Sequence, residues 1–269
     1  MKFQLKALAA ALALVAAVPA HAAMDLATFG NSSFVLSVFD KVANVSASFD
    51  LGKNYLDFNQ VATAGAVSTV AAQGTTFSWD LAGNADYSSA WSSFMGAATL
   101  PNIQYAITAA DNTGNPAPGS RGYITTLAAT GLSLSNSGMV TAMGNFDTYI
   151  NVQNFNGHVA ANGSVFSNTS TAAGVLYNSN RVGGSTNGPL TVGALGSSLG
   201  VIQVTYGGTT AFAPTLATVF GNGAQFNLAS NGALLYSTTP LAPVPEADTW
   251  AMMLLGLGFM GFVARRKQA

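Results

Sequence analysis

The stretch NSSFVLSVFDKVANVSASF, residues 31–49, is the part of the chain that best indicates its fold. Residues 31–40 are rich in β-branched and aromatic side chains, which favour a strand. From Val42 to Phe49 apolar and small polar residues alternate, so successive side chains fall on opposite faces of an extended chain. We therefore expect two consecutive strands here.

Three further segments have the same character, at residues 75–79, 103–107 and 201–206. Asn-Gly pairs, which tolerate the positive φ angles of tight hairpins, recur between these segments. They begin at Asn156, Asn162, Asn187, Asn222 and Asn231. The absence of a repeat of 20 to 50 residues argues against a solenoid or a propeller. The pattern predicts a mainly-β fold, a β-sandwich-like single domain.

Two segments interrupt the β pattern with helical spacing. Residues 86–98 place Trp91 and Phe94 three apart, and a second helix is expected to begin at Ser137 as its cap. The apolar residues of this second helix are Met139, Met143, Phe146 and Ile150. Both stripes are interpreted as parts of the core, so the fold should contain one or two short helices.

Composition limits the kinds of partner. Charged residues make up 7% of the 269 residues, against roughly 25% in an ordinary soluble domain. The few bases between the chain ends form no basic patch, which argues against nucleic acid as a partner. The chain has no cysteine, which excludes disulfides, thiolate nucleophiles and cysteine metal sites.

The first 22 residues have the order of a secretory signal peptide. Lys2 and Lys6 precede an apolar run at residues 7–18, and Ala20 and Ala22 form a small-x-small cleavage site. We therefore expect residues 1–22 to be removed and residues 23–236 to form an exported domain. The alternative is a buried N-terminal core helix.

The last 33 residues form two further segments. Residues 237–246 hold three prolines and are expected to form a stiff stalk. Residues 247–269 contain the uncharged run 250–264, which as a helix would be about 22 Å long. This is shorter than the hydrocarbon core of a bilayer, which is ~30 Å thick. Trp250 at the interface, and basic side chains that extend towards the headgroups, can cover the remaining thickness. We expect a transmembrane helix with Arg265, Arg266 and Lys267 as a stop-transfer tail in the cytoplasm; a buried helix of the domain is the alternative.

A Pro-Glu motif, then one hydrophobic helix, then an arginine-rich end resembles the PEP-CTERM sorting signal of Gram-negative bacteria. Val244, Pro245 and Glu246 match the start of the usual Val-Pro-Glu-Pro-Ser-Thr-Trp pattern, and Thr249 and Trp250 match its end. Ala247 and Asp248 replace the customary Pro and Ser. The resemblance covers about 27 residues. It implies export, transient anchoring in the membrane, processing by an exosortase near residues 244–246, and an association with exopolysaccharide.

Patterns that would indicate catalysis or metal binding are weak. Gly196 to Gly200 match the G-x-S-x-G nucleophile elbow, but the residues that follow favour a strand, so we expect a turn. After signal removal His158 is the remaining histidine, too few for a multi-histidine zinc site. Asp80, Asp86 and Asp111 lie in oxygen-rich loops and are weak calcium candidates. We expect no cofactor and no catalytic residues.

Two functions from different classes remain. The first is a non-catalytic surface or matrix protein, structural or adhesive, that contacts exopolysaccharide or other copies of itself. The second is a carbohydrate-binding or carbohydrate-active module that acts on exopolysaccharide, for which Trp79, Trp91 or Tyr105 would have to be exposed. Burial of all three aromatic side chains would favour the first.

Overall fold

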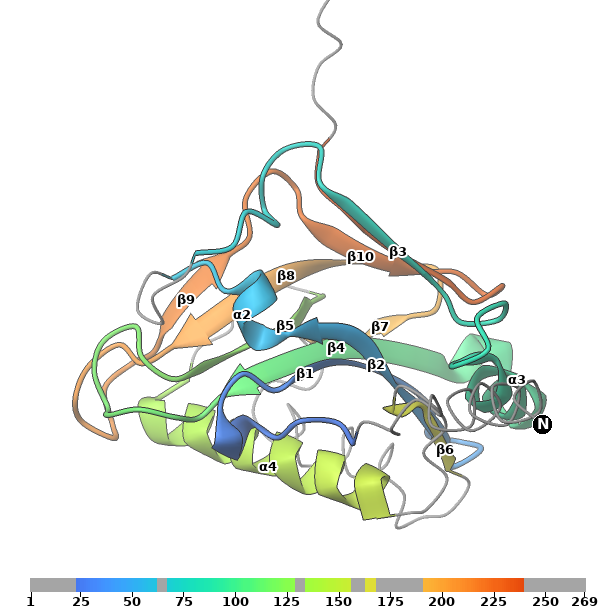
Figure 1. Cartoon of the computed structure of the whole chain (residues 1–269), viewed down its shortest axis with the longest axis horizontal. Helices are drawn as coiled ribbons and strands as arrows, with labels where there is room; N and C mark the ends of the chain where they lie inside the picture. The colour runs from blue at the N-terminus through green and yellow to red at the C-terminus, as the bar shows by residue number, and fades with distance from the viewer. Residues whose placement is uncertain (1–22, 62–66, 129–133, 156–162, 168–190, 240–269) are drawn as a thin grey trace, which may run out of the picture. The chain divides into compact units, whose positions relative to one another are not determined.

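The computed structural model of the chain describes residues 23–61, 67–128, 134–155, 163–167 and 191–239 (Figure 1). The two strands expected at residues 31–49 are present as β1 (Ser33–Asp40) and β2 (Val45–Asn54), which pair antiparallel. The chain reverses between them because Asp40 Oδ1 accepts bonds from the N–H groups of Val42 (2.8 Å) and Ala43 (3.0 Å). The residues before Val45, which the alternation placed in a strand, therefore belong to a turn.

The strands belong to one antiparallel sheet of 11 strands. Their order is β3-β11-β10-β8-β5-β4-β1-β2-β6, with β7 paired to β4 and β9 paired to β8. The remaining strands are β3 (Thr76–Asp80), β4 (Ile103–Asp111), β5 (Gly122–Leu127), β6 (Val165–Ser167), β7 (Gly193–Ala194), β8 (Ser198–Thr205), β9 (Leu216–Val219), β10 (Gln225–Leu228) and β11 (Ala233–Ser237). The Asn-Gly turn predicted at Asn222 is confirmed, since Asn222 and Gly223 have φ angles of 54° and 63° between β9 and β10.

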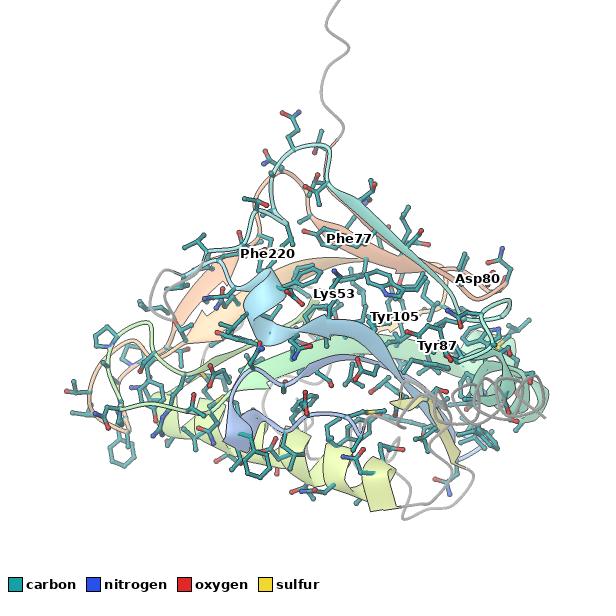
Figure 2. The ribbon with its side chains drawn as sticks, viewed as in Figure 1. Lys53, Phe77, Asp80, Tyr87, Tyr105 and Phe220 are labelled. Atoms are coloured by element: carbon teal, nitrogen blue, oxygen red, sulfur yellow. The ribbon has the colours of Figure 1, made fainter. Side chains whose placement is uncertain are left out.

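The sheet curls until β3, at one end of the strand order, lies opposite β2. No strand pairing joins β3 to β2. Side chains make the contact instead: Trp79 Nε1 donates to the carbonyl of Leu51 (2.8 Å), and Lys53 Nζ lies 5.3 Å from the centre of the Phe77 ring (Figure 2). We call this line of contacts between β2 and β3 the seam.

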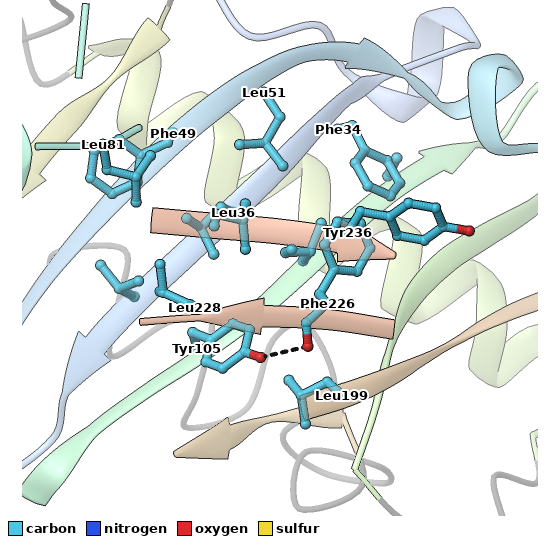
Figure 3. Close-up of a cluster of buried hydrophobic side chains, with 14 of the residues drawn as sticks. Phe34, Leu36, Phe49, Leu51, Leu81, Tyr105, Leu199, Phe226, Leu228 and Tyr236 are labelled. Carbon is cyan, nitrogen blue, oxygen red and sulfur yellow. Dashed lines mark hydrogen bonds between the residues drawn. The ribbon is translucent and has the colours of Figure 1, made fainter. Parts of the chain in front are cut away.

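The inside of the curl is filled with apolar and aromatic side chains (Figure 3). Phe34 of β1 stacks on Phe58 with ring centres 4.3 Å apart, and Phe226 of β10 packs against both rings. Tyr105 is fully buried in this core, with its hydroxyl 3.0 Å from the carbonyl of Phe226. Both halves of the curled sheet thus share one core.

Helix α4 (Asn136–Phe155) packs on the outer face of the sheet (Figure 1). Its predicted apolar stripe is confirmed as core: Met139, Met143, Phe146 and Ile150 are all at most 1% exposed. The cap was predicted wrongly. Ser135, not Ser137, accepts the N–H of Gly138 through its side chain, because the helix begins two residues earlier than expected.

Two shorter α-helices and two 3₁₀ helices are also present among the described residues. Helix α3 (Ser88–Ala97) confirms the prediction at residues 86–98, with Trp91 and Phe94 buried. Helix α2 (Tyr55–Phe58), η1 (Ala27–Phe29) and η3 (Leu100–Asn102) are single turns that no periodic pattern indicated. Such short turns depend on local caps, which leave little trace in periodicity.

The mainly-β prediction is confirmed. The two opposed layers of a sandwich are supplied here by the two ends of one curled sheet. The chain divides into two compact units, residues 1–239 and residues 240–269. Among the residues that the structure describes, none forms a helix that is long and apolar enough to cross a membrane.

Candidate functional site

The residues predicted for export and sorting lie outside the described residues. They are Ala20 and Ala22 of the signal peptide, Val244, Pro245, Glu246, Thr249 and Trp250 of the sorting motif, and Arg265, Arg266 and Lys267 of the basic tail. His158 also lies outside them. A candidate site is therefore sought among the described side chains of residues 23–239.

The acidic residues considered for calcium do not come together. Asp80 ends β3, where its Oδ1 accepts the N–H groups of Ala82 (3.1 Å) and Gly83 (2.8 Å) and so shapes a turn (Figure 2). Asp86 lies just before α3, whereas Asp111 ends β4. Within the described ranges no three His, Cys, Asp or Glu side chains are grouped so that they could hold a metal ion.

Asp111 instead lines a hollow beside the loop that joins β4 to β5. The cavity has a volume of about 180 Å³. Its walls are the side chains of Tyr55, Asp111, Thr113, Ser120 and Arg121 and the backbone of two loop glycines. This hollow brings together residues that are up to 66 positions apart in the chain.

The loop is held in shape by bonds to its own backbone. Arg121 has a φ of 43°, in the left-handed region, and its Nε and Nη2 both donate to the carbonyl of Gly114, at 2.9 and 2.7 Å. Its guanidinium carbon lies 5.7 Å from the centre of the Tyr206 ring. Backbone bonds between Tyr206 and residues 119 and 120 fix the loop to the end of β8. The Arg121 side chain therefore has a defined place at the rim.

The opposite wall is a phenol held by buried amides. Tyr55 is 4% exposed, and its hydroxyl accepts a bond from Gln203 Nε2 (2.7 Å). Gln203 is fully buried and also donates to Asn59 Oδ1 (2.6 Å) while accepting the N–H of Gln60 (2.7 Å). Burial raises the pKa of Tyr55; the bond from Gln203 opposes this rise, and the Asp111 carboxylate adds to it. The phenol consequently remains protonated at neutral pH.

Of these wall residues, the sequence had singled out Asp111 alone, and for a different chemistry. Arg121 is one of the few bases between the chain ends, and the sequence assigned it no site. The signal that could have found it is its position as a lone base in a chain with so little charge. Tyr55 and Gln203 gave no signal, because they meet only when α2 packs against β8.

The other candidate residues of the exported domain are engaged elsewhere. Trp91 is 4% exposed and Tyr105 is fully buried. Trp79 is half-buried, and its indole N–H is used at the seam. The turn between β7 and β8 covers residues 195–197, with Gly196 at a φ of 85°, and the rest of the G-x-S-x-G segment, Ser198 to Gly200, begins strand β8 rather than a helix. The expectation of a turn is confirmed.

Comparison with known protein families gives one match. The model of the PEP-CTERM protein-sorting motif matches residues 243–267. The chain carries a PEP-CTERM sorting motif. No match was found among curated proteins or among solved structures.

The PEP-CTERM match covers all the residues that had been assigned to sorting. It includes the Val-Pro-Glu start, the Thr-Trp end, the apolar run and the three terminal bases. The family model therefore matches the motif even though Ala247 and Asp248 replace the customary Pro and Ser. The motif indicates a protein that is exported and sorted at the membrane by an exosortase.

Proposed function

We propose that this protein is an exosortase substrate whose exported domain acts at the cell surface or in the extracellular matrix as a structural or adhesive component. The observation that carries the proposal is the PEP-CTERM match at residues 243–267. A signal-peptide pattern at residues 1–22 supports it, because an exosortase substrate must first enter the export pathway.

The tail acts through the order of its parts. The prolines of residues 237–246 keep the motif extended and away from the folded domain, so that an enzyme at the membrane surface reaches its backbone. The apolar run 250–264 holds the motif at that surface. The three bases at residues 265–267 stop translocation, since each charge at the bilayer centre costs roughly 2.5–3.5 kcal/mol.

The positions and the burial of the residues considered for catalysis and for sugar binding support a non-catalytic role. The G-x-S-x-G serine, Ser198, is the first residue of strand β8 and is not followed by a helix, and Trp91 and Tyr105 are core residues that no polysaccharide chain can reach. A carbohydrate-active module built on Trp91 or Tyr105 is therefore the weaker alternative. Trp79 is only half-buried, so burial of all three aromatic side chains is not observed. Low charge and abundant Ser, Thr and Asn suit contact with neutral polymers or with other copies of the chain.

Intact-mass measurement of mature protein from a host that contains an exosortase tests the proposal. The wild-type chain should lack its apolar run and basic tail. Changing Pro245 and Glu246 together to Ala should leave the full tail in place, whereas Pro240→Ala, in the stalk but outside the matched residues, should be processed normally. Persistent retention of residues 250–269 by the wild-type protein would mean that the tail is a plain anchor.

A further inference from the structure

The hollow beside the β4–β5 loop has the chemistry of a ligand site. Its lining includes Tyr55, the first residue of α2, Asp111, the last residue of β4, and Arg121, the residue before β5. Its volume of about 180 Å³ is below the roughly 300–1,000 Å³ of pockets for drug-sized molecules. A ligand that fits wholly inside it is therefore small, of the size of one ring with its substituents.

The polar groups of the hollow retain unused hydrogen-bonding capacity. Asp111 Oδ1 accepts the N–H and the hydroxyl of Thr113, at 2.9 and 2.5 Å, while Oδ2 has no partner among the described residues. Arg121 uses Nε and Nη2 on Gly114, and its Nη1 has no partner within the same ranges. The Tyr55 hydroxyl accepts from Gln203, which leaves its own proton to donate.

Asp111 and Arg121 form no ion pair with each other, although both line the same small hollow. A free carboxylate opposes the binding of an anion, and a free guanidinium opposes the binding of a cation. Together they favour a neutral molecule whose groups both donate and accept. Hydroxyl groups do both, since each carries one proton and two lone pairs. Two neighbouring hydroxyls on a ring would give one proton to Asp111 Oδ2 and accept from Arg121 Nη1.

The hollow is also prepared before any ligand arrives. Arg121 is held by two bonds to one carbonyl and lies over the ring of Tyr206, and Tyr55 is held by the fully buried Gln203. Groups that are already fixed lose little side-chain entropy on binding, which is what makes weak polar contacts effective. A flexible surface arginine and aspartate would not have this property.

From these contacts we propose that the hollow binds one neutral pyranose residue of a polysaccharide, with Asp111 as acceptor and Tyr55 and Arg121 as donors. The site binds and does not cleave, since one carboxylate cannot supply both the acid and the base of glycoside hydrolysis. It would give the exported domain a defined adhesive contact. The site does not depend on the tail, so its test is separate from the processing experiment.

Saturation-transfer NMR of the unprocessed chain with its sorting tail attached, in a detergent without a sugar headgroup, tests this site. The probes are the methyl pyranosides of glucose, galactose and mannose, with glucuronic acid and glucosamine as charged counterparts. At least one neutral pyranoside should receive saturation and bind at least tenfold more tightly than either charged sugar. A preference for glucuronic acid or for glucosamine, or no transfer to any neutral pyranoside, would overturn the proposal.

Substitutions locate the binding. Asp111→Asn keeps an oxygen for Thr113 but removes the charge, and should weaken binding at least tenfold. Tyr55→Phe keeps the ring and removes the donated proton, and should weaken binding severalfold. Asp80→Asn is the matched control, because Asp80 shapes a turn by the same kind of bond far from the hollow in the chain. Unchanged binding in Asp111→Asn and in Tyr55→Phe, with folding verified by circular dichroism, would contradict the assignment.

Discussion

Asp40 and Asp50 belong to the same hairpin, but their carboxylates are surrounded differently. Burial of Asp40 is more than offset by bonds from the N–H groups of Thr99, Ala43 and Val42, which lower its pKa below the ordinary value of 3.8. Burial raises the pKa of Asp50, although bonds from Ser33 and Gly52 oppose the rise. Hydrogen bonds determine the direction of the pKa shift at Asp40, and desolvation determines it at Asp50.

Asp40→Asn and Asp50→Asn should therefore have opposite pH dependence. As pH falls, the unfolded chain protonates before Asp40 does in the folded chain, so the contribution of Asp40 is present above pH 3.8 and is lost below it. The free energy of unfolding of Asp40→Asn should be about 1–3 kcal/mol below that of the wild-type protein at neutral pH, and this deficit should shrink in acid. For Asp50 the folded chain protonates first, so the deficit of Asp50→Asn should be largest in acid and shrink as pH rises above 3.8.

Urea unfolding of both variants and the wild-type protein, from about pH 3 to about pH 7, measures these differences. The other carboxylates titrate in all three proteins and cancel in the comparison. Two deficits that change in the same direction with pH would contradict the assignment of at least one carboxylate.

At the scale of elements, the seam replaces the strand pairing that would close the sheet. Two side chains reach across it to adjacent carbonyls of β2: Trp79 Nε1 donates to Leu51 (2.8 Å) and the Tyr87 hydroxyl donates to Asp50 (2.7 Å). β3 has a ladder partner on one side only, β11. The Trp79 bond therefore holds β3 against β2 directly, whereas the Tyr87 bond fixes the start of α3, the next helix after β3, to β2.

Trp79→Phe should loosen β3 more than it unfolds the domain. The change removes one side-chain hydrogen bond, worth about 0.5–1.5 kcal/mol, and leaves most of the aromatic packing in place. Amide hydrogen exchange of residues 76–80 should accelerate severalfold, while the amides of β1 stay protected. Tyr87→Phe should act in the same direction through the neighbouring carbonyl.

Leu235→Ala is the control, since Leu235 lies on β11 next to β3 with its side chain 44% exposed and away from the core. It should leave exchange in β3 unchanged. Equal exchange in wild-type and Trp79→Phe protein would show that the seam does not hold β3.

The elements that the sequence predicted are those with a strong local pattern. β1, β2, β3, β4, β8, α3 and α4 were all indicated by β-branched runs, by alternation or by helical spacing. β9 was not, because its four residues are all exposed and carry no alternation. The curl of the sheet could not be predicted from local sequence patterns either, because it depends on contacts such as that between Trp79 and Leu51, which are 28 residues apart. Similarly, the sequence singled out Asp111, but the hollow that Asp111 lines forms only when α2 and the end of β8 pack beside it.

At the scale of the whole molecule, the exported domain and the sorting tail are separate units. The boundary between the two units lies between Thr239 and Pro240. The sequence had ended the domain at Tyr236, because residues 237–246 were assigned to the proline-rich stalk, but β11 includes Ser237. The two threonines that follow add bonds of their own, which no alternation pattern would indicate.

A fragment of residues 23–239 should therefore fold without the tail, whereas a fragment of residues 23–236 should be less stable. Thr238 is 5% exposed, donates its N–H to the Thr75 carbonyl (3.0 Å) and accepts the Thr75 N–H through its side chain (2.9 Å). Thr239 bonds through its N–H to Asn222 (2.7 Å) and through its carbonyl to Gly74 (3.0 Å). Loss of these bonds leaves partners unsatisfied, which should cost about 2–4 kcal/mol in all.

Circular dichroism and urea unfolding compare the two fragments. Both should show a mainly-β spectrum, and the longer fragment should unfold cooperatively at a higher urea concentration with an unchanged slope. A fragment of residues 23–239 with Thr238→Ala should fall between the two, because it keeps the backbone bonds and loses only those of the hydroxyl. This outcome would mean that removal of the sorting tail beyond Thr239 releases a complete domain. A non-cooperative transition of the longer fragment would instead make the tail part of the fold.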